Sequence, residues 1–304
     1  MENNLTKINK LVLENTKGYI EQVEDEYHKR IRVAVKEVLQ SGRRIILLAG
    51  PSASGKTTTA HLLCKYLKEA GVHSEIISLD DFFLEQNQMP YDEQGVIDYE
   101  SVHSLDTDGI IKALNEINDS SKTELPVFSF KNKTRESFTR PINVGNDGAV
   151  IVEGLHALNP LIADSLDAKN VLKLYISVVA SYVDDDGAEL LESRNIRLMR
   201  RMSRDILYRA STPESCLKLF SSVVRGEDKY LCPYRDTAEI ELCSFHDYEI
   251  CLFKPLLYNK LKALTSSVEN YDRVQKIIAA MKNAVEINQT NVPKNSLMQE
   301  FIGQ

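Results

Sequence analysis

One short segment, residues 44–58, limits the folds open to this chain more than any other feature. It reads RIILLAGPSASGKTT. It fits the pattern G-x-x-x-x-G-K-[ST] at four positions: Gly50, Gly55, Lys56 and Thr57. Apolar residues before the pattern predict a buried strand over 45–49, and those after it predict a helix over 57–67. A strand that enters a helix through a glycine-rich turn is typical of phosphate binding, because backbone N–H groups surround the oxygens at the helix N-terminus.

The side chains of this turn predict a nucleotide ligand. We expect Lys56 to reach the β- and γ-phosphates, the Thr57 hydroxyl to ligate Mg²⁺, and Thr58 to contact the α-phosphate. The nucleotide-binding residues expected from the turn are Gly50, Ser52, Ala53, Ser54, Gly55, Lys56, Thr57 and Thr58. The alternative is a glycine-rich turn without chemistry, and the flanking strand and helix argue against it.

Composition excludes several classes of partner. The 304 residues carry a formal net charge of -7, so no global positive field draws the chain to nucleic acid or to an anionic membrane. The N-terminus has no apolar signal core, and no apolar run approaches the length of a membrane span. Five cysteines without a C-x-x-C pair favour reduced thiols. We therefore expect a cytoplasmic protein that binds neither nucleic acid nor membrane.

Strand-like and helix-like segments alternate along the chain, which predicts an α/β fold with a mostly parallel sheet flanked by helices. The expected strands are 45–49, 73–79, 148–153, 171–179 and 238–245. In such sheets ligands bind beyond the carboxyl ends of the strands. Asp80, Asp81 and Glu153 follow or end two of these strands.

Each strand-end acid has a functional and a structural interpretation. Asp80 could accept the proton of an attacking hydroxyl or help to hold Mg²⁺, whereas an aspartate here could also cap the next helix. We assign the base to Asp80 and a capping or supporting role to Asp81. Glu153 could deliver a carboxylate to the magnesium ion, or be a solvated acid at the end of its strand.

A dense arginine cluster is the main concentration of positive charge. It comprises Arg194, Arg197, Arg200, Arg201, Arg204 and Arg209. Planar guanidinium groups suit the clamping of phosphoryl oxygens, and a helix of this kind can close over a site as a lid. A solvated helix face paired with Asp205 and Glu192 is the competing interpretation. His156, three residues after Glu153, is a candidate substrate contact.

Ordered blocks along the chain resemble the uridine kinase and phosphoribulokinase family of P-loop kinases. The blocks are GPSASGKTT, SLDDFF, IDYES, PVFSFKNKTR, VIVEGLHALNP and RLMRRMSRDILYR, and the resemblance runs from about residue 45 to residue 255. It implies a kinase domain over 43–284 with an arginine-rich lid at about 190–212. Residues 1–42 would form an N-terminal helical extension, and 285–304 a loose polar tail.

The resemblance also implies roles for individual residues. It implies Lys56, Asp80 and Arg200 as catalytic, Arg201 and Arg204 as further nucleotide contacts, and Thr57, Asp80 and Glu153 around Mg²⁺. The substrate-binding residues it implies are Asp80, Asp98, Phe128, Lys133, Arg135, Glu153, His156, Arg197 and Arg209. Phe128 and Lys133 stand where relatives that phosphorylate uridine and cytidine have Tyr and His, so the identity of the acceptor stays open.

Three functions are compatible with these residues. The first is transfer of the γ-phosphoryl of ATP, with Mg²⁺, to a hydroxyl of a nucleoside similar to uridine or cytidine. The second is a kinase of another small acceptor, such as a sugar phosphate, which Lys133 would favour. The third is a nucleotide-binding regulatory module with little catalysis. A homo-oligomer is compatible with all three.

Overall fold

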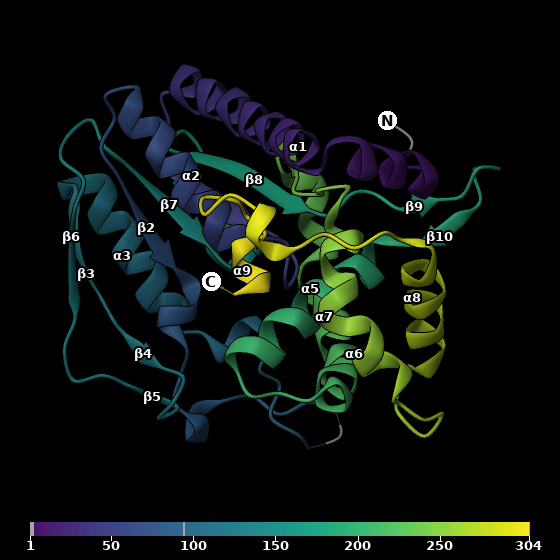
Figure 1. Cartoon of the computed structure of the whole chain (residues 1–304). Coiled ribbons are helices and arrows are strands. Elements are labelled where there is room, and N and C mark those ends of the chain that lie inside the picture. The colour runs from purple at the N-terminus through teal and green to yellow at the C-terminus, as the bar shows by residue number, and fades with distance from the viewer. Residues whose placement is uncertain (1–2, 94, 304) are drawn as a thin grey trace.

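The computed structural model describes residues 3–93 and 95–303. Its centre is a five-stranded sheet with the strand order β11-β8-β1-β7-β2, and every pairing in it is parallel (Figure 1). The strands are β1 (Ile45–Ala49), β2 (Ser74–Ser78), β7 (Ala149–Glu153), β8 (Val171–Ser177) and β11 (Ile240–Cys243). The predicted α/β fold with a mostly parallel sheet is confirmed.

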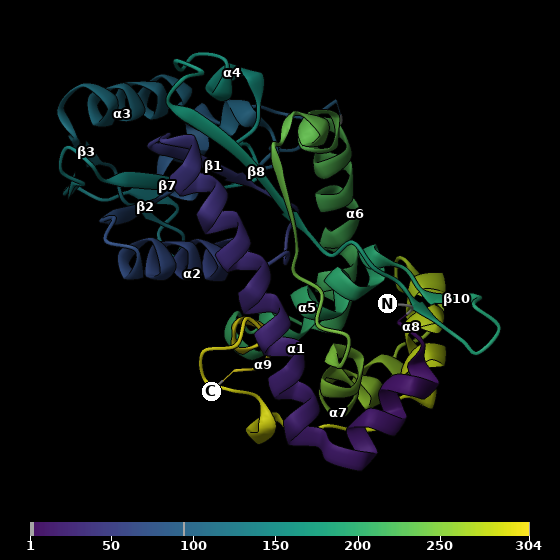
Figure 2. The same cartoon turned by 90° about the horizontal axis from the view of Figure 1, so that it is seen from above.

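Helices cover both faces of this sheet. On one face lie α1 (Leu5–Ser41) and α2 (Lys56–Glu69), and on the other lie α3 (Thr107–Ser120) and α4 (Pro160–Ala163) (Figure 2). Strand β1 shows how the sequence achieves this, because its five residues are all buried and alternate between the two faces. Ile46 and Leu48 pack with the core under α1 and α2, whereas Ile45, Leu47 and Ala49 pack with the core under α3.

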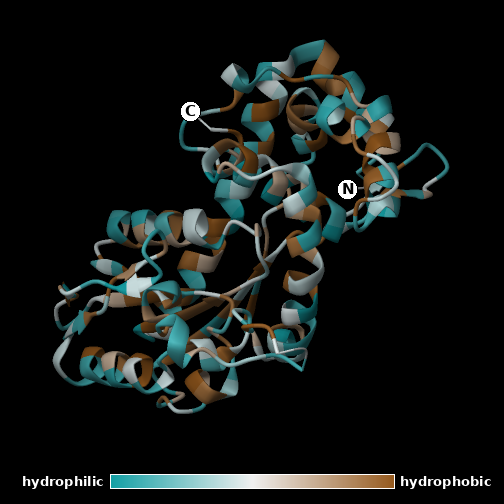
Figure 3. Cartoon of the chain, turned by 90° about the horizontal axis from the view of Figure 1, so that it is seen from below, coloured by the Kyte–Doolittle hydropathy of each residue, from teal (hydrophilic) through white to brown (hydrophobic). Residues whose placement is uncertain are grey.

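A helical lobe lies beyond the carboxyl ends of the strands. It contains α5 (Ser193–Tyr208), α6 (Pro213–Tyr230), α7 (Glu249–Lys262), α8 (Tyr271–Asn283) and α9 (Gln299–Ile302). Figure 3 shows this lobe beside the sheet, with apolar residues gathered along the strands and on the inward helix faces. Helix α5, which we expected to be a lid, packs against α6, α7 and α9, and its movement stays a prediction.

Short antiparallel pairs complete the fold. Strands β3 (Lys122–Leu125) and β6 (Arg140–Asn143) pair near the edge of the sheet, and β4 (Phe128–Ser129) pairs with β5 (Thr134–Arg135). Strands β9 (Tyr182–Val183) and β10 (Glu189–Leu191) form a third pair. Among the described residues, no helix combines the length and the apolar character that crossing a bilayer requires.

The expectation of a loose tail over 285–304 is wrong for the residues described. Six apolar side chains of this segment are buried: Ile287, Val292, Leu297, Met298, Phe301 and Ile302. Polar groups fix it as well, because Ser296 Oγ donates to Glu24 Oε1 at 2.6 Å. The apolar residues are spaced irregularly within a polar segment, so no helical or strand period indicated that they would pack.

Candidate active site

The carboxyl ends of β1, β2 and β7 open into one cavity of about 740 Å³. Three groups of residues line it around the turn after β1 and the two strand ends beside it: Ser52, Ala53, Gly55, Lys56, Thr57 and Thr58; then Leu79, Asp80 and Phe83; then Glu153, Leu155 and His156. Helix α5 and the segment after β2 supply further walls. Segments far apart in the sequence therefore meet at the position that a parallel sheet predicts for a ligand.

We call residues 50–57 the phosphate loop, and its backbone fits a bound phosphate. Ala53 and Gly55 have positive φ angles of 59° and 86°, so the chain curls and turns successive N–H groups inward. Gly50 permits this turn, since a Cβ there would lie 2.2 Å from the carbonyl oxygen of Ile176. The Ser54 hydroxyl is buried, and no described atom hydrogen-bonds to it. An anion in the loop would supply what this geometry leaves unsatisfied.

Lys56, the first residue of α2, folds back over the phosphate loop. Its Nζ donates to the carbonyl oxygens of Gly50 at 2.9 Å and Pro51 at 3.2 Å. Its charge also acts on Asp80 and Glu153, where it opposes the rise in the pKa of both carboxyls. Lys56 is therefore held beside the cavity with two acids in its field.

The residues expected to hold Mg²⁺ lie together. Thr57 Oγ1 is 3.3 Å from Glu153 Oε1, and Ser78 Oγ donates to the same oxygen at 3.0 Å. The described part of the chain holds no cluster of three histidine, cysteine or acidic residues that could cage a metal alone. Mg²⁺ usually keeps several waters and takes only one or two carboxylates plus phosphate oxygens, so this oxygen set fits that ion.

Asp80 lies in the helical turn Leu79–Phe82 that directly follows β2, and it lines the cavity. Its side chain is exposed to the solvent in the cavity, and desolvation by the cavity walls raises the pKa of its carboxyl, with Lys56 opposing the rise and Asp81 adding to it. Asp81 points elsewhere, because its Oδ2 lies 3.9 Å from the guanidinium of Arg140. The structure thus places Asp80 in the cavity lining and Asp81 outside it, and the assignment of the base to Asp80 stays a prediction.

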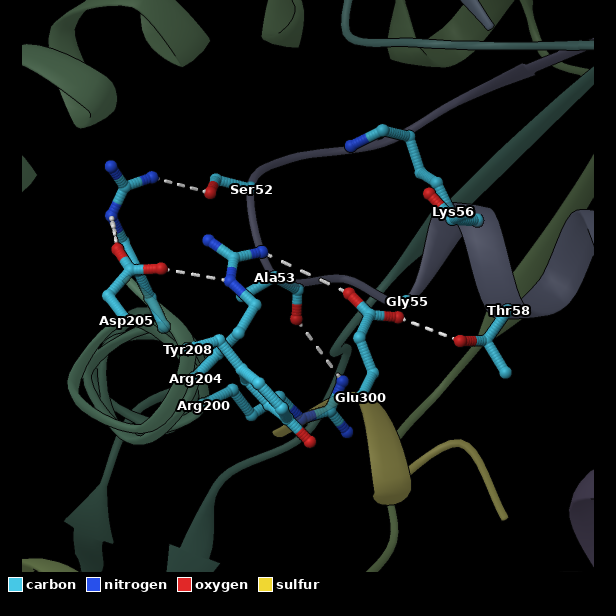
Figure 4. Close-up of polar contacts among 12 residues, drawn as sticks. Ser52, Ala53, Gly55, Lys56, Thr58, Arg200, Arg204, Asp205, Tyr208 and Glu300 are labelled. Carbon is cyan, nitrogen blue, oxygen red and sulfur yellow. Dashed lines mark hydrogen bonds and ion pairs between the residues drawn. The ribbon is translucent and has the colours of Figure 1, made fainter. Parts of the chain in front are cut away.

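Three of the arginines face the cavity: Arg201, Arg204 and Arg209. The buried carboxylate of Asp205 organises them, at 3.4, 2.9 and 3.5 Å from their Nε atoms respectively. Arg201 also donates to Ser52 Oγ at 2.7 Å. Figure 4 shows the Arg204 side chain between Asp205 and Glu300. These three side chains therefore concentrate positive charge along one side of the cavity.

Arg197 and Arg200 do not reach the cavity, contrary to expectation. Arg200 is fully buried and pairs with Glu249 at 2.6 Å, and Arg197 makes two bonds of 2.7 Å to Glu227. Each also donates to a carbonyl of the phosphate loop: Arg197 to Ser52 and Arg200 to Ala53. Because their guanidinium groups bond to buried acids and to loop carbonyls, these two arginines hold the phosphate loop in place. The catalytic role expected for Arg200 and the substrate contact expected for Arg197 are therefore wrong.

Two more expected substrate residues lie outside the cavity lining. The Asp98 carboxylate accepts from the Tyr230 hydroxyl at 3.0 Å and from the backbone N–H of Glu100 at 3.1 Å. Arg135 pairs with Asp106 at 3.1 Å and donates to nearby backbone carbonyls. Their polar groups have protein partners, and the structure brings neither residue to the cavity lining.

The far end of the cavity is aromatic. Phe128 and Lys133 line it as expected, together with Phe83 and Phe130. The ring centroids of the three phenylalanines lie 5.1–5.9 Å apart. His156 also lines the cavity and is 5% exposed, and its Nδ1 has no hydrogen-bond partner among the described atoms. Burial lowers the pKa of His156 to about 4, so the imidazole is neutral near pH 7.

The sequence analysis missed two acids of the cavity, Glu100 and Glu300. Glu100 is itself part of the IDYES block (residues 97–101), but the resemblance assigned a role only to Asp98, two residues before it. Glu300 lies in the segment expected to be loose. Glu300 belongs to none of the sequence blocks that carry the resemblance. The one usable signal was the position of Glu100 two residues after an assigned acid.

Glu100 predicts a pH-dependent stability. Burial, reinforced by Glu227 and Asp98, raises its pKa from 4.5 to about 7, so the folded chain holds this proton more tightly than the unfolded chain. Its carboxyl therefore costs stability increasingly as pH rises from 4.5 to about 7. Glu100→Gln should therefore have a higher free energy of unfolding than the unaltered chain at pH 8. The difference between the two proteins should be larger at pH 8 than at pH 4.5, by at most ~3 kcal/mol. Urea unfolding of both proteins at pH 4.5 and pH 8 measures these free energies. The same difference between variant and unaltered chain at both pH values would contradict the prediction.

A phosphate loop at the end of a central parallel strand, with a lysine, four acids and three arginines lining one cavity, is typical of the P-loop class of proteins. The family model described as Phosphoribulokinase / Uridine kinase family matches residues 45–251. The chain belongs to this family of kinases, which confirms the resemblance.

Two known proteins illustrate the relationship. A uridine kinase of Staphylococcus aureus (strain JH9) is 29% identical over 198 residues, which are 64% of this chain and 85% of that protein. The structure of a candidate fructose transport system kinase from Silicibacter sp. TM1040 covers 69% of this chain and 98% of its own, with a TM-score of 0.51 and 17% identity. The second likeness concerns the fold alone.

Proposed function

We propose that this protein transfers the γ-phosphoryl group of ATP to a hydroxyl of a nucleoside similar to uridine or cytidine. Family membership supports the kinase activity, and the nucleoside acceptor is our own inference. The observation that carries it is that Asp80 lines the same cavity as the phosphate loop and the three phenylalanines of the aromatic end. A hydroxyl held at the aromatic end would face both a carboxylate and the terminal phosphate.

Each group near the phosphate loop has a role in this reaction. Lys56 and the loop N–H groups hold the donor phosphates, and Asp80 accepts the proton of the attacking hydroxyl. Arg201, Arg204 and Arg209 neutralise charge that develops on the phosphoryl oxygens. Thr57 and Glu153 would hold Mg²⁺, which shields the charge of the phosphates.

The aromatic end favours an uncharged acceptor that carries a planar ring. Phe83, Phe128 and Phe130 offer ring faces and edges for stacking. The acids Asp80 and Glu100 line the same cavity and would repel a second phosphate group. Lys133, at the tip between β4 and β5, is the observation that favours the alternative, a phosphorylated sugar as acceptor.

A coupled assay of ADP release tests the proposal over a panel of uridine, cytidine, other nucleosides and sugar phosphates. Turnover with uridine or cytidine supports it. Turnover only with a phosphorylated sugar would replace it with the alternative acceptor. Tight ATP binding without turnover on any acceptor would instead support a regulatory module.

A further inference from the structure

The segment 296–302 contributes Glu300 to the lining of the cavity, although it lies outside residues 45–251 that the family model matches. Leu297 packs directly on the phosphate loop, since a Cβ on Gly55 would lie 2.4 Å from its Cδ1. The buried Ser203 hydroxyl of α5 donates to the carbonyl oxygen of Phe301 at 2.7 Å. Leu297, Met298 and Phe301 are all fully buried. The backbone of this segment is therefore anchored beside the nucleotide-binding turn.

Glu300 extends from this anchored segment into the cavity. Its Oε2 accepts a hydrogen bond from Thr58 Oγ1 at 2.8 Å, and its Oε1 lies 4.0 Å from Nη1 of Arg204. Figure 4 shows the carboxylate between these two groups, on the side of the loop away from the Lys56 ammonium. The side chain is 23% exposed, which leaves its oxygens accessible from the cavity.

The order of groups along a nucleotide suggests what meets this carboxylate. In a phosphate loop the lysine serves the β- and γ-phosphates, and the α-phosphate lies further along the start of the helix. Thr58, two residues beyond Lys56, is on the α-phosphate side by that order. The ribose follows the α-phosphate, so it would come next to Glu300.

The charge of the Glu300 carboxylate further restricts which part of a nucleotide could contact it. A carboxylate only accepts hydrogen bonds when ionised, and it repels phosphate oxygens. Ribose hydroxyls are uncharged donors, and an acidic side chain that binds a ribose hydroxyl is an established way to recognise a nucleotide. The anchored backbone keeps Glu300 within reach after its bond to Thr58 is exchanged for one to a ligand.

We propose that Glu300 accepts a hydrogen bond from a ribose hydroxyl of the donor nucleotide, so that the segment 296–302 contributes to donor selection. This inference rests on the proposed function, because it requires a nucleotide in the phosphate loop. The competing idea is that the carboxylate stands in for a phosphate on Thr58 and Arg204 and is displaced when the nucleotide binds.

Calorimetric titration of the full chain with Mg²⁺ and ATP, 2′-deoxy-ATP or 3′-deoxy-ATP tests this without any acceptor. The unaltered chain should bind ATP about 10-fold or more tightly than one of the two deoxy nucleotides, the size expected for a hydrogen bond to a charged group. Glu300→Ala should bring that ratio close to one. Glu286→Ala, an exposed acid of the same tail, should leave it unchanged.

Glu300→Gln keeps the shape of the side chain and guards against misfolding of the alanine variant. It should weaken the discrimination without lowering the melting temperature. A ratio that is unchanged in both variants, or equal tightening for all three nucleotides, would overturn the inference and favour the displaced carboxylate. No ATP binding by the unaltered chain would overturn the proposed function, and the inference with it.

Discussion

Lys56→Ala is expected to abolish turnover, with kcat falling about 10²–10³-fold or more. The lysine is the cation nearest to the donor phosphates in our proposal, and its Nζ already lies within the phosphate loop, 2.9 Å from the carbonyl of Gly50. No other side chain of α2 can replace that charge, since Lys65 and Lys68 are exposed and further along the helix. Steady-state ADP release with saturating ATP measures the effect.

Lys68→Ala provides a matched control. It removes the same kind of side chain from an exposed position near the other end of α2 and should leave kcat within a few-fold of the unaltered chain. Melting temperatures of both variants show whether the fold is retained. Activity of a folded Lys56→Ala variant within a few-fold of the original would remove the phosphate-loop assignment.

Asp80→Asn is expected to lower kcat by about 10²–10⁴-fold, the usual range when a general base is lost. The substitution keeps the size of the side chain but removes its capacity to accept a proton. Nucleotide binding should survive, because the phosphate loop does not change. Single-turnover kinetics, together with the dissociation constant for ATP, separates loss of chemistry from loss of binding.

Asp81→Asn is the control for this variant. Asp81 is adjacent in sequence and also acidic, but it lies near Arg140 and outside the cavity lining. Its loss should cost only a small part of the activity. If Asp80→Asn retained full kcat while Asp81→Asn lost it, the base would have to be reassigned to Asp81.

The sheet and the phosphate loop were predictable because their signals are local. Residues 45–49 form β1 within the predicted bounds, and Lys56 begins the helix that the motif requires. Parallel strands then place their carboxyl ends together, so Asp80 and Glu153 could be assigned to one site before any contact was known. Local pattern and topology were sufficient for this half of the site.

The arginines show where local reasoning ends. Helical spacing places four of the arginines on neighbouring faces of α5. It does not reveal which of them form ion pairs with acids of other helices. Glu227 of α6 and Glu249 of α7 capture two of the four. These partners are 30 and 49 residues away in sequence, and only the packing of the helical lobe pairs them. The contribution of Glu300 escaped for the same reason.

The hold of Arg197 and Arg200 on the phosphate loop restricts how reactants can enter and leave. An outward movement of helix α5 would break the two buried ion pairs of these arginines and their hydrogen bonds to the carbonyls of Ser52 and Ala53. The β4–β5 hairpin is held less firmly, because its ion pair between Arg135 and Asp106 is about one-third exposed and Phe130 beside its turn is exposed. We therefore expect substrates and products to enter and leave the cavity beside that hairpin, while helix α5 stays in place.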